Sequence, residues 1–177
     1  KTLVVSLAVV LGMTFSAVAA DKVKVGFIYV GPTGDHGWTY RHDIGRQQVE
    51  EAYGDKVETI FVESVPEGPD AERVMHSMVR EGVDIIFATS FGYMDPMVKA
   101  AAKNPDTIFM HATGYKGNKK NMDNYSCMSY QARYLAGVAA GMLTKTGKIG
   151  IVGSHPIPEI IRNINAVILG ARTINPN

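Results

Sequence analysis

Residues 23–38 read Val-Lys-Val-Gly-Phe-Ile-Tyr-Val-Gly-Pro-Thr-Gly-Asp-His-Gly-Trp, and this stretch decides the fold. Its first half, 23–30, is rich in strand-forming residues without helical spacing, which is typical of a strand buried on both faces of a parallel sheet. Its glycine-rich half, 31–38, leads into a segment, 39–53, whose composition favours a helix. Strand, turn and helix open a βαβ unit, and the turn after such a strand lines the ligand crevice of an open α/β sheet.

Strand-like and helix-like segments alternate along the rest of the chain. Further strands are expected at 57–62, 83–88, 107–112, 125–128 and 148–153, and further helices at 71–81, 96–103, 130–144 and 158–171. Asp70 and Asp95 are expected as N-caps of the helices that follow them. The alternation predicts the α/β class, with a parallel sheet covered by helices on both faces.

The composition is close to average, with 46% hydrophobic residues, 20% charged residues and a net charge of +1. Lysine and arginine are spread along the sequence and balanced by acids, so no nucleic-acid partner is expected. The single cysteine, Cys127, excludes an internal disulfide and a cysteine-based zinc site. We therefore expect a soluble globular chain without a cofactor.

The two ends carry signals of their own. An apolar run follows Lys1 and ends in Ala17-Val-Ala-Ala20, the small-residue pattern that a signal peptidase cleaves. Residues 1–20 are therefore predicted to be a signal peptide, with a membrane anchor as the alternative. No cysteine near the cleavage pattern could accept a lipid, so we expect a freely diffusing periplasmic protein. The missing first Met and the end at Asn175-Pro-Asn177 indicate a fragment.

Aromatic side chains follow two of the predicted strands. Trp38, the only tryptophan, lies beside three glycines, which leave its ring uncovered. Phe91 and Tyr93 follow the third strand, and they either converge on the same crevice or belong to the core. No Lys or Arg lies in the turns 31–38 and 89–95, which makes a phosphate ligand a poor fit. The crevice therefore favours a flat, uncharged ring.

Acidic side chains near these turns allow two interpretations. Asp35, Asp43 and Asp95 could supply acceptors to a ligand that carries N–H groups. Asp35 and Asp43, together with His36 and His42, could instead hold a divalent metal, or the two aspartates could cap or flank a helix N-terminus. No HExxH spacing is present, and no metal is assigned.

Catalytic alternatives are weaker. Ser90, His111 and Asp95 could converge at the sheet edge, but the chain has no G-x-S-x-G elbow. Gly31, Gly34 and Gly37 follow a G-x-x-G-x-x-G spacing, which does not match the dinucleotide-binding fingerprint. No catalytic residue is assigned.

Four segments together resemble one known family. They are 25–46, with Gly-Pro-Thr-Gly-Asp-His-Gly-Trp at its centre, Ser90-Phe-Gly-Tyr-Met-Asp95, Tyr134-Leu-Ala-Gly-Val-Ala-Ala140 and Ile149-Gly-Ile-Val-Gly153. They resemble the basic membrane protein (BMP) family, substrate-binding proteins of ABC transporters related to the purine nucleoside receptor PnrA. The resemblance implies a type I periplasmic-binding-protein fold, in which two α/β lobes hold a ligand between them. Residues 21–128 would then form the N-terminal lobe, and 129–177 the start of an incomplete, truncated second lobe.

The resemblance also implies a binding site. The ring-stacking aromatic of the family falls on Trp38, beside a family acid at Asp35. Where the nucleoside-binding branch has Asp-Gln-Glu-Gly, this chain has Ser129-Tyr-Gln-Ala132, which favours a free base such as adenine over a nucleoside. The predicted ligand contacts are Gly34, Asp35, Trp38, Ser90, Phe91, Gly92, Ser129, Tyr130 and Gln131.

The function implied by this resemblance is capture without catalysis. A monomeric periplasmic protein would bind a purine nucleobase or nucleoside, with adenine favoured, and deliver it to an ABC permease in the inner membrane. Two alternatives from other classes stay open. One is a secreted hydrolase or deaminase acting on nucleosides, and the other is a sensory receptor that uses the same fold.

Overall fold

A parallel sheet forms the centre of the described chain. The computed structural model describes residues 22–176, so the predicted signal peptide, residues 1–20, lies outside the described residues. The strands lie in the order β2-β1-β3-β4-β5, and every neighbouring pair is parallel. Their bounds are β1 (Val23–Ile28), β2 (Val57–Val62), β3 (Ile85–Ala88), β4 (Ile108–Ala112) and β5 (Met122–Tyr125). The predicted α/β class with a parallel sheet is confirmed.

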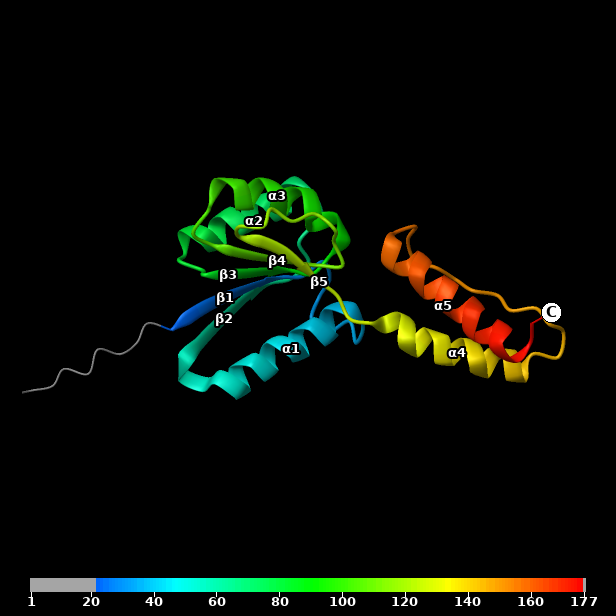
Figure 1. Ribbon diagram of the computed structural model, residues 1–177. Coiled ribbons are helices and arrows are strands. Elements are labelled where there is room, and N and C mark those ends of the chain that lie inside the picture. The colour runs from blue at the N-terminus through cyan, green and yellow to red at the C-terminus, as the bar shows by residue number, and fades with distance from the viewer. Residues whose placement is uncertain (1–21, 177) are drawn as a thin grey trace, which may run out of the picture.

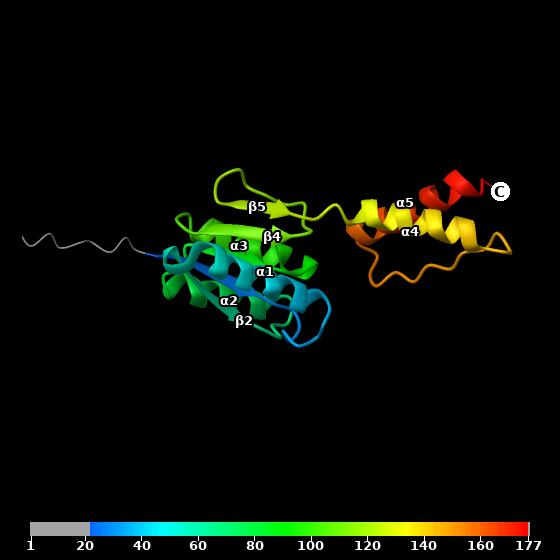
Figure 2. The ribbon, with the colours of Figure 1, turned by 90° about the horizontal axis from the view of Figure 1, so that it is seen from below.

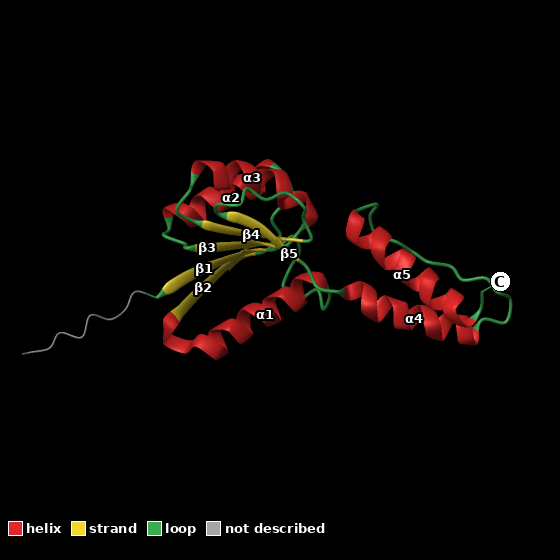
Figure 3. Ribbon diagram, viewed as in Figure 1, coloured by secondary structure: helices red, strands yellow, loops and turns green. Residues whose placement is uncertain are grey.

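Helices cover both faces of the sheet (Figures 1 and 3). Helix α1 (Trp38–Tyr53) lies on one face, and α2 (Pro69–Arg80) and α3 (Met94–Lys103) lie on the other. Side chains of β1 alternate between two apolar clusters: Ile28 packs with the residues of α2 and α3, and Phe27 stacks on Phe87 at 5.2 Å between ring centroids. From Val25 to Ile28 both faces of this central strand are buried, which explains the absence of polar side chains there.

A pair of helices follows the sheet, α4 (Ser129–Leu143) and α5 (Pro158–Ile174). Figures 1 and 2 show the two helices side by side and running in the same direction, with residues 126–128 as the connection from β5. Their backbones meet at glycines, because a Cβ at Gly137 would overlap the Val167 carbonyl oxygen and one at Gly170 would overlap that of Tyr134. The absence of side chains at these positions allows the close approach.

The strand predicted at 148–153 is wrong. The segment is irregular and exposed, and Val152 is 100% exposed. A parallel strand needs a neighbouring strand to satisfy its backbone groups, and none of the strands in residues 22–176 lies beside this segment. The apolar sequence Ile149-Gly-Ile-Val152 has strand propensity without a partner.

The fifth strand lies three residues before its predicted position. It spans 122–125 instead of 125–128, and it pairs with β4 from Phe109↔Met122 to Ala112↔Tyr125. The buried Asn121 fixes this register, since its amide donates to the carbonyl oxygens of Ala101, Asn104 and Thr107. These tertiary bonds outweigh the stronger strand propensity of the segment after Tyr125.

Neither predicted N-cap is confirmed. Helix α2 begins at Pro69 with Gly68 as its N-cap, and α3 begins at Met94 with Tyr93 as its N-cap, both without a side-chain cap bond. Asp70 and Asp95 lie inside the first turns, where a negative charge still interacts favourably with the helix dipole.

Between residues 22 and 176, no helix has both the length and the apolar character needed to span a membrane.

Candidate ligand-binding site

The strand order places a topological switch point between β1 and β3, which we call the crevice. The chain leaves β1 through α1 on one face of the sheet and leaves β3 through α3 on the other face, so the two connecting loops diverge. In open α/β sheets, ligands bind outside the carboxyl ends of the strands at such a switch point. Predicted site residues from both loops, Gly34 to Trp38 and Ser90 to Gly92, lie here.

The loops at this edge carry backbone strain. His36, Ser64 and Thr113 have positive φ angles of 54°, 55° and 63°, although none is glycine. They lie in the loops that leave β1, β2 and β4. Non-glycine residues in the left-handed region are costly and cluster at functional sites, so their position supports a binding role for this edge.

Trp38 connects the two loops of the crevice. Its Nε1–H donates to the Thr89 carbonyl oxygen at 2.5 Å, and the Thr89 hydroxyl donates to the Ile28 carbonyl oxygen at 2.9 Å. Trp38 is 40% exposed, and the centroid of its ring lies 4.6 Å from the centroid of the His42 ring. The indole is thus held by its polar edge while much of its surface stays accessible, as a stacking platform requires.

Asp35 caps helix α1. Its Oδ1 accepts from the backbone N–H groups of Gly37 at 2.7 Å and Tyr40 at 3.0 Å, and its Oδ2 accepts from that of Thr39 at 3.2 Å. The backbone donors, Gly37 first and then Tyr40, lower the pKa of Asp35. The capping interpretation is therefore confirmed for Asp35, and its contact with a ligand stays a prediction.

Replacing Asp35 by alanine should lower the urea midpoint of unfolding, because three N–H groups lose their acceptor. Since folding lowers the pKa of Asp35, its stabilisation is complete above the ordinary aspartate pKa and is lost as the pH falls through the folded-state value. The difference in midpoint between Asp35→Ala and the wild type should shrink between about pH 7 and about pH 3. Asp106→Ala is the control, and a pH-independent difference for Asp35→Ala would contradict the prediction.

The turn after β3 is held by an acid that sequence reasoning missed. Glu67 Oε1 accepts from the Ser90 hydroxyl at 2.5 Å and from the Gly92 N–H at 3.0 Å. Phe91 lies beside Tyr115, with 6.2 Å between ring centroids. Glu67 lies in the segment Val65-Pro-Glu-Gly68, which follows the carboxyl end of β2. Its place after a parallel strand was the signal that could have identified it.

Of the aromatic residues expected at the crevice, Tyr93 belongs to the core. It is fully buried, and its hydroxyl donates to the Val65 carbonyl oxygen at 2.5 Å. Tyr115, which the sequence did not single out, is the exposed aromatic beside Phe91 instead.

Two of the three aspartates expected to face a ligand are engaged elsewhere. Asp43 is buried in α1, where it accepts from Arg46 Nε and Gln47 Nε2, each at 2.7 Å. Asp95 accepts from Lys116 Nζ at 2.6 Å, so a cation from the β4–β5 loop reaches the edge of this region. The flank-or-cap interpretation is wrong for Asp43, which lies in the second turn of α1 and accepts from Arg46 and Gln47 of that helix and from the Tyr29 hydroxyl. The part of the chain that the structure describes contains no cluster of potential metal ligands.

His111 supports the backbone of the binding turn. It is fully buried, and its Nε2–H donates to the Ser90 carbonyl oxygen at 2.8 Å. The Ser90 hydroxyl bonds to Glu67 instead, and Asp95 pairs with Lys116, so the three residues considered for nucleophilic catalysis do not form a relay. Burial lowers the pKa of His111, and the Ser90 carbonyl opposes this shift.

The lowered pKa of His111 predicts a pH-dependent stability. The unfolded chain takes up a proton near the ordinary histidine pKa of about 6.5, whereas the folded chain resists it. The free energy of unfolding should therefore fall as the pH drops from about 7 towards about 5, and His111→Gln should flatten this slope. Urea unfolding at several pH values measures it. His155→Gln, at an exposed position, is the control, and an unchanged slope in His111→Gln would contradict the prediction.

The remaining predicted contacts lie in the α4–α5 pair. Ser129 donates to Asn163 Oδ1 at 3.1 Å, the Arg162 guanidinium lies 5.5 Å from the Tyr130 ring centroid, and Gln131 donates to Met128 Sδ at 3.7 Å. The bonds described for these three residues are therefore made within the pair and the segment that leads into it. Their contact with a ligand stays a prediction.

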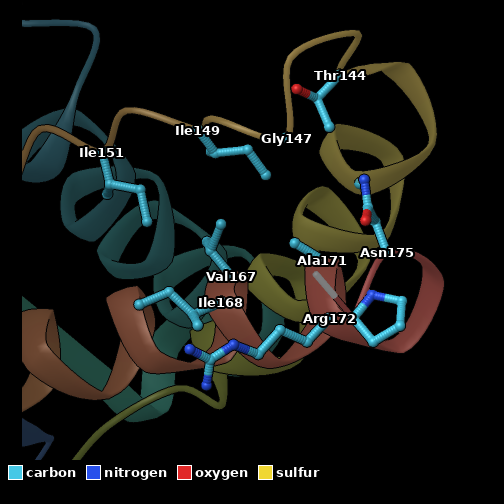
Figure 4. A pocket seen from close by; sticks show the side chains of 11 residues that line it. Thr144, Gly147, Ile149, Ile151, Val167, Ile168, Ala171, Arg172 and Asn175 are labelled. Carbon is cyan, nitrogen blue, oxygen red and sulfur yellow. The ribbon is translucent and has the colours of Figure 1, made fainter.

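The α4–α5 pair also contains a pocket of about 380 Å³ (Figure 4). Ile149 and Ile151 from the irregular segment face Val167 and Ile168 of α5 across it. It is lined by the apolar residues of an unpaired segment and lies on different elements from Trp38. We therefore assign the candidate site to the β1–β3 crevice.

The described sheet, with helices on both faces and an anchored, exposed indole at its switch point, has the architecture of a doubly wound α/β lobe. A solved solute-binding protein of an ABC transporter from Aeropyrum pernix K1 has this fold, with a TM-score of 0.72 at 22% identity over 87% of this chain and 44% of that chain. Residues 22–177 match the model of the Bmp family, described as ABC transporter substrate-binding protein PnrA-like. The chain belongs to this family.

Two relatives differ in their named ligands. A purine-binding protein of Brucella abortus (strain 2308) is 53% identical over 162 residues, which cover 92% of this chain and 46% of the relative. A Haloferax volcanii protein, provisionally named an ABC transporter glucose-binding protein, is 47% identical over 156 residues, 88% of this chain and 39% of the relative. The chain spans less than half the length of these curated relatives.

Proposed function

We propose that this chain contributes the N-terminal lobe, residues 21–128, and the beginning of the second lobe, from residue 129, to the substrate-binding component of an ABC importer. The protein captures a purine nucleobase or nucleoside in the periplasm as a monomer, with adenine the favoured ligand, and delivers it to a membrane permease. Family membership and the purine-binding relative support the proposal.

The observation that carries the proposal is the anchored indole of Trp38. A base stacked on it would bury roughly 150 Å² of apolar surface, which stabilises the complex by about 4 kcal/mol at about 25 cal/mol per Å². Micromolar affinity requires about 8 kcal/mol. Hydrogen bonds to the ligand and closure of the second lobe supply the rest in this proposal.

The acceptors in the crevice suit the same ligand class. Asp35 and Glu67 lie in loops at the carboxyl ends of β1 and β2, and neither forms an ion pair with a Lys or Arg of residues 22–176. Carboxylates accept hydrogen bonds from the N–H groups of a base and repel phosphate.

Titration of the full-length protein tests the proposal. Adenine, adenosine, guanosine and riboflavin are added one at a time, with calorimetry and tryptophan fluorescence as readouts. We expect heat and a change in fluorescence with at least one purine, and chromatography of the mixture should return the ligand unchanged. No signal with any purine would contradict the proposal, and a converted product would favour the enzyme alternative.

Glucose is a second candidate, favoured by the name of the Haloferax relative. An aromatic ring also packs against the apolar face of a sugar, and carboxylates accept bonds from its hydroxyl groups. The same titration separates the two candidates, because the purine proposal expects no heat with glucose.

A further inference from the structure

The Glu67 carboxyl group packs against the turn 90–92. A Cβ added at Gly92 would overlap the Glu67 carboxyl group, so this carboxyl group occupies the space that only a glycine leaves open. The backbone of Gly92 is not in the left-handed region, so what the glycine allows here is the close approach of the Glu67 carboxyl group. Two donors then hold Oε1, the Ser90 hydroxyl at 2.5 Å and the Gly92 N–H at 3.0 Å.

The second carboxylate oxygen is left for another partner. Within the described residues, Glu67 Oε2 accepts no hydrogen bond and no Lys or Arg pairs with the carboxylate. Its negative charge acts on its surroundings, since burial first and the charge of Glu67 second raise the pKa of Tyr93. A carboxylate that is fixed through one oxygen presents the other as an acceptor in a defined position.

The neighbouring charges reinforce this acceptor. Glu63, on the same loop, accepts from the Thr33 N–H at 2.7 Å through Oε2, and Asp35 caps α1. Lys116, on the loop between β4 and β5, is bound to Asp95 at 2.6 Å. The loops after β1 and β2 therefore place carboxylates at the crevice, while the charge of Lys116 is already neutralised by Asp95.

We propose that Glu67 is a specificity-determining residue of the binding site: its Oε2 accepts a hydrogen bond from an N–H group of the bound purine, and its charge excludes phosphorylated ligands. The inference rests on the proposed function and deepens it, because it names which purines are accepted. Bases and nucleosides bind, and nucleotides do not.

Glu67→Gln tests the acceptor with little change in shape. The glutamine Oε1 still accepts from Ser90 and Gly92, but an NH₂ donor replaces Oε2 and opposes the ligand N–H group. Bonds to charged groups contribute about 1.5–3 kcal/mol, so adenine affinity should fall by about tenfold or more. Calorimetry of the full-length protein with adenine, adenosine and adenosine monophosphate measures it. Wild type should bind adenosine at least tenfold more tightly than its monophosphate, and the variant should narrow this ratio.

Two further variants separate the effect of the position of the Glu67 carboxylate from the effect of its negative charge. Gly92→Ala displaces the carboxylate without removing it, so it should weaken adenine binding like Glu67→Gln, and the double variant should show less than the sum because both break one contact. Glu51→Gln removes an equal charge from an exposed position near the C-terminal end of α1, away from the turn 90–92, so its adenine affinity should stay within about threefold of wild type. Thermal unfolding confirms that each variant is folded.

The outcomes are distinct. Wild-type adenine affinity in Glu67→Gln, or an equal loss in Glu51→Gln, would overturn the assignment while leaving the proposed function intact. Wild-type protein that binds glucose and no purine would overturn the proposed function and the assignment of a purine N–H partner together. Absence of heat with every ligand would have the same consequence.

Discussion

Adenine affinity should fall by at least tenfold, and up to about a thousandfold, when Trp38 is replaced by alanine. The expected stacking contribution of about 4 kcal/mol sets the upper limit, and loss of the bond from Nε1 to Thr89 frees the turn after β3 in addition. Calorimetry with the full-length protein measures the dissociation constant of each variant.

Two control variants define what the ring contributes. Trp38→Phe keeps a flat ring but lacks the N–H donor, so it should retain more affinity than Trp38→Ala. Tyr53→Ala removes an aromatic ring that is 57% exposed at the other end of α1, away from the crevice, and should bind as wild type. Equal affinity of Trp38→Ala and wild type would show that the indole does not stack on the ligand.

Gly137→Leu should separate α4 from α5. Even the Cβ of the new leucine would overlap the Val167 carbonyl oxygen. Backbone atoms cannot rotate out of the way as a flexible side chain can. Overpacking at well-packed sites costs about 1–3 kcal/mol, and a clash with backbone lies at the upper end of this range or beyond it. Hydrogen exchange in α4 and α5 should accelerate strongly, while exchange in the sheet should change little.

The matched control for this prediction is Gly150→Ala. No atom lies within 4 Å of a Cβ added at Gly150, and its backbone is not in the left-handed region, so the substitution should leave exchange in both helices unchanged. Retained protection of α4 and α5 in Gly137→Leu would contradict the close packing of the two helices.

Much of the sheet was predictable because its strands carry their own signals. β2 spans the predicted 57–62, and β1, β3 and β4 end within a few residues of their predicted bounds, since apolar runs bounded by turns are typical of buried parallel strands. Residues 148–153 have the same local pattern but form no strand. A strand needs a neighbouring strand to pair with, and local propensity does not show whether one is present. β5 shifted because Asn121 satisfies three distant carbonyl groups, which no local pattern reveals.

The site was predictable in its location more than in its contacts. The rule that ligands bind at the carboxyl ends of parallel strands placed Trp38 and Ser90 on neighbouring loops, and the bond from Trp38 to Thr89 joins those loops. Glu67 and Lys116 were missed because their relevance depends on which loops meet in space. Asp43 was misjudged because its position one turn inside α1 directs it to Arg46 and Gln47.

The all-parallel strand order has a consequence for how the chain folds. β1 pairs with β2 on one side and with β3 on the other, so the first strand to be synthesised cannot complete its ladder until residues 85–88 have been made. No two strands of the described sheet form a local hairpin. Such long-range pairing must overcome a large loop-closure entropy, and it slows folding. A slow-folding chain stays open for longer after synthesis, which would favour passage through an export channel before the sheet closes.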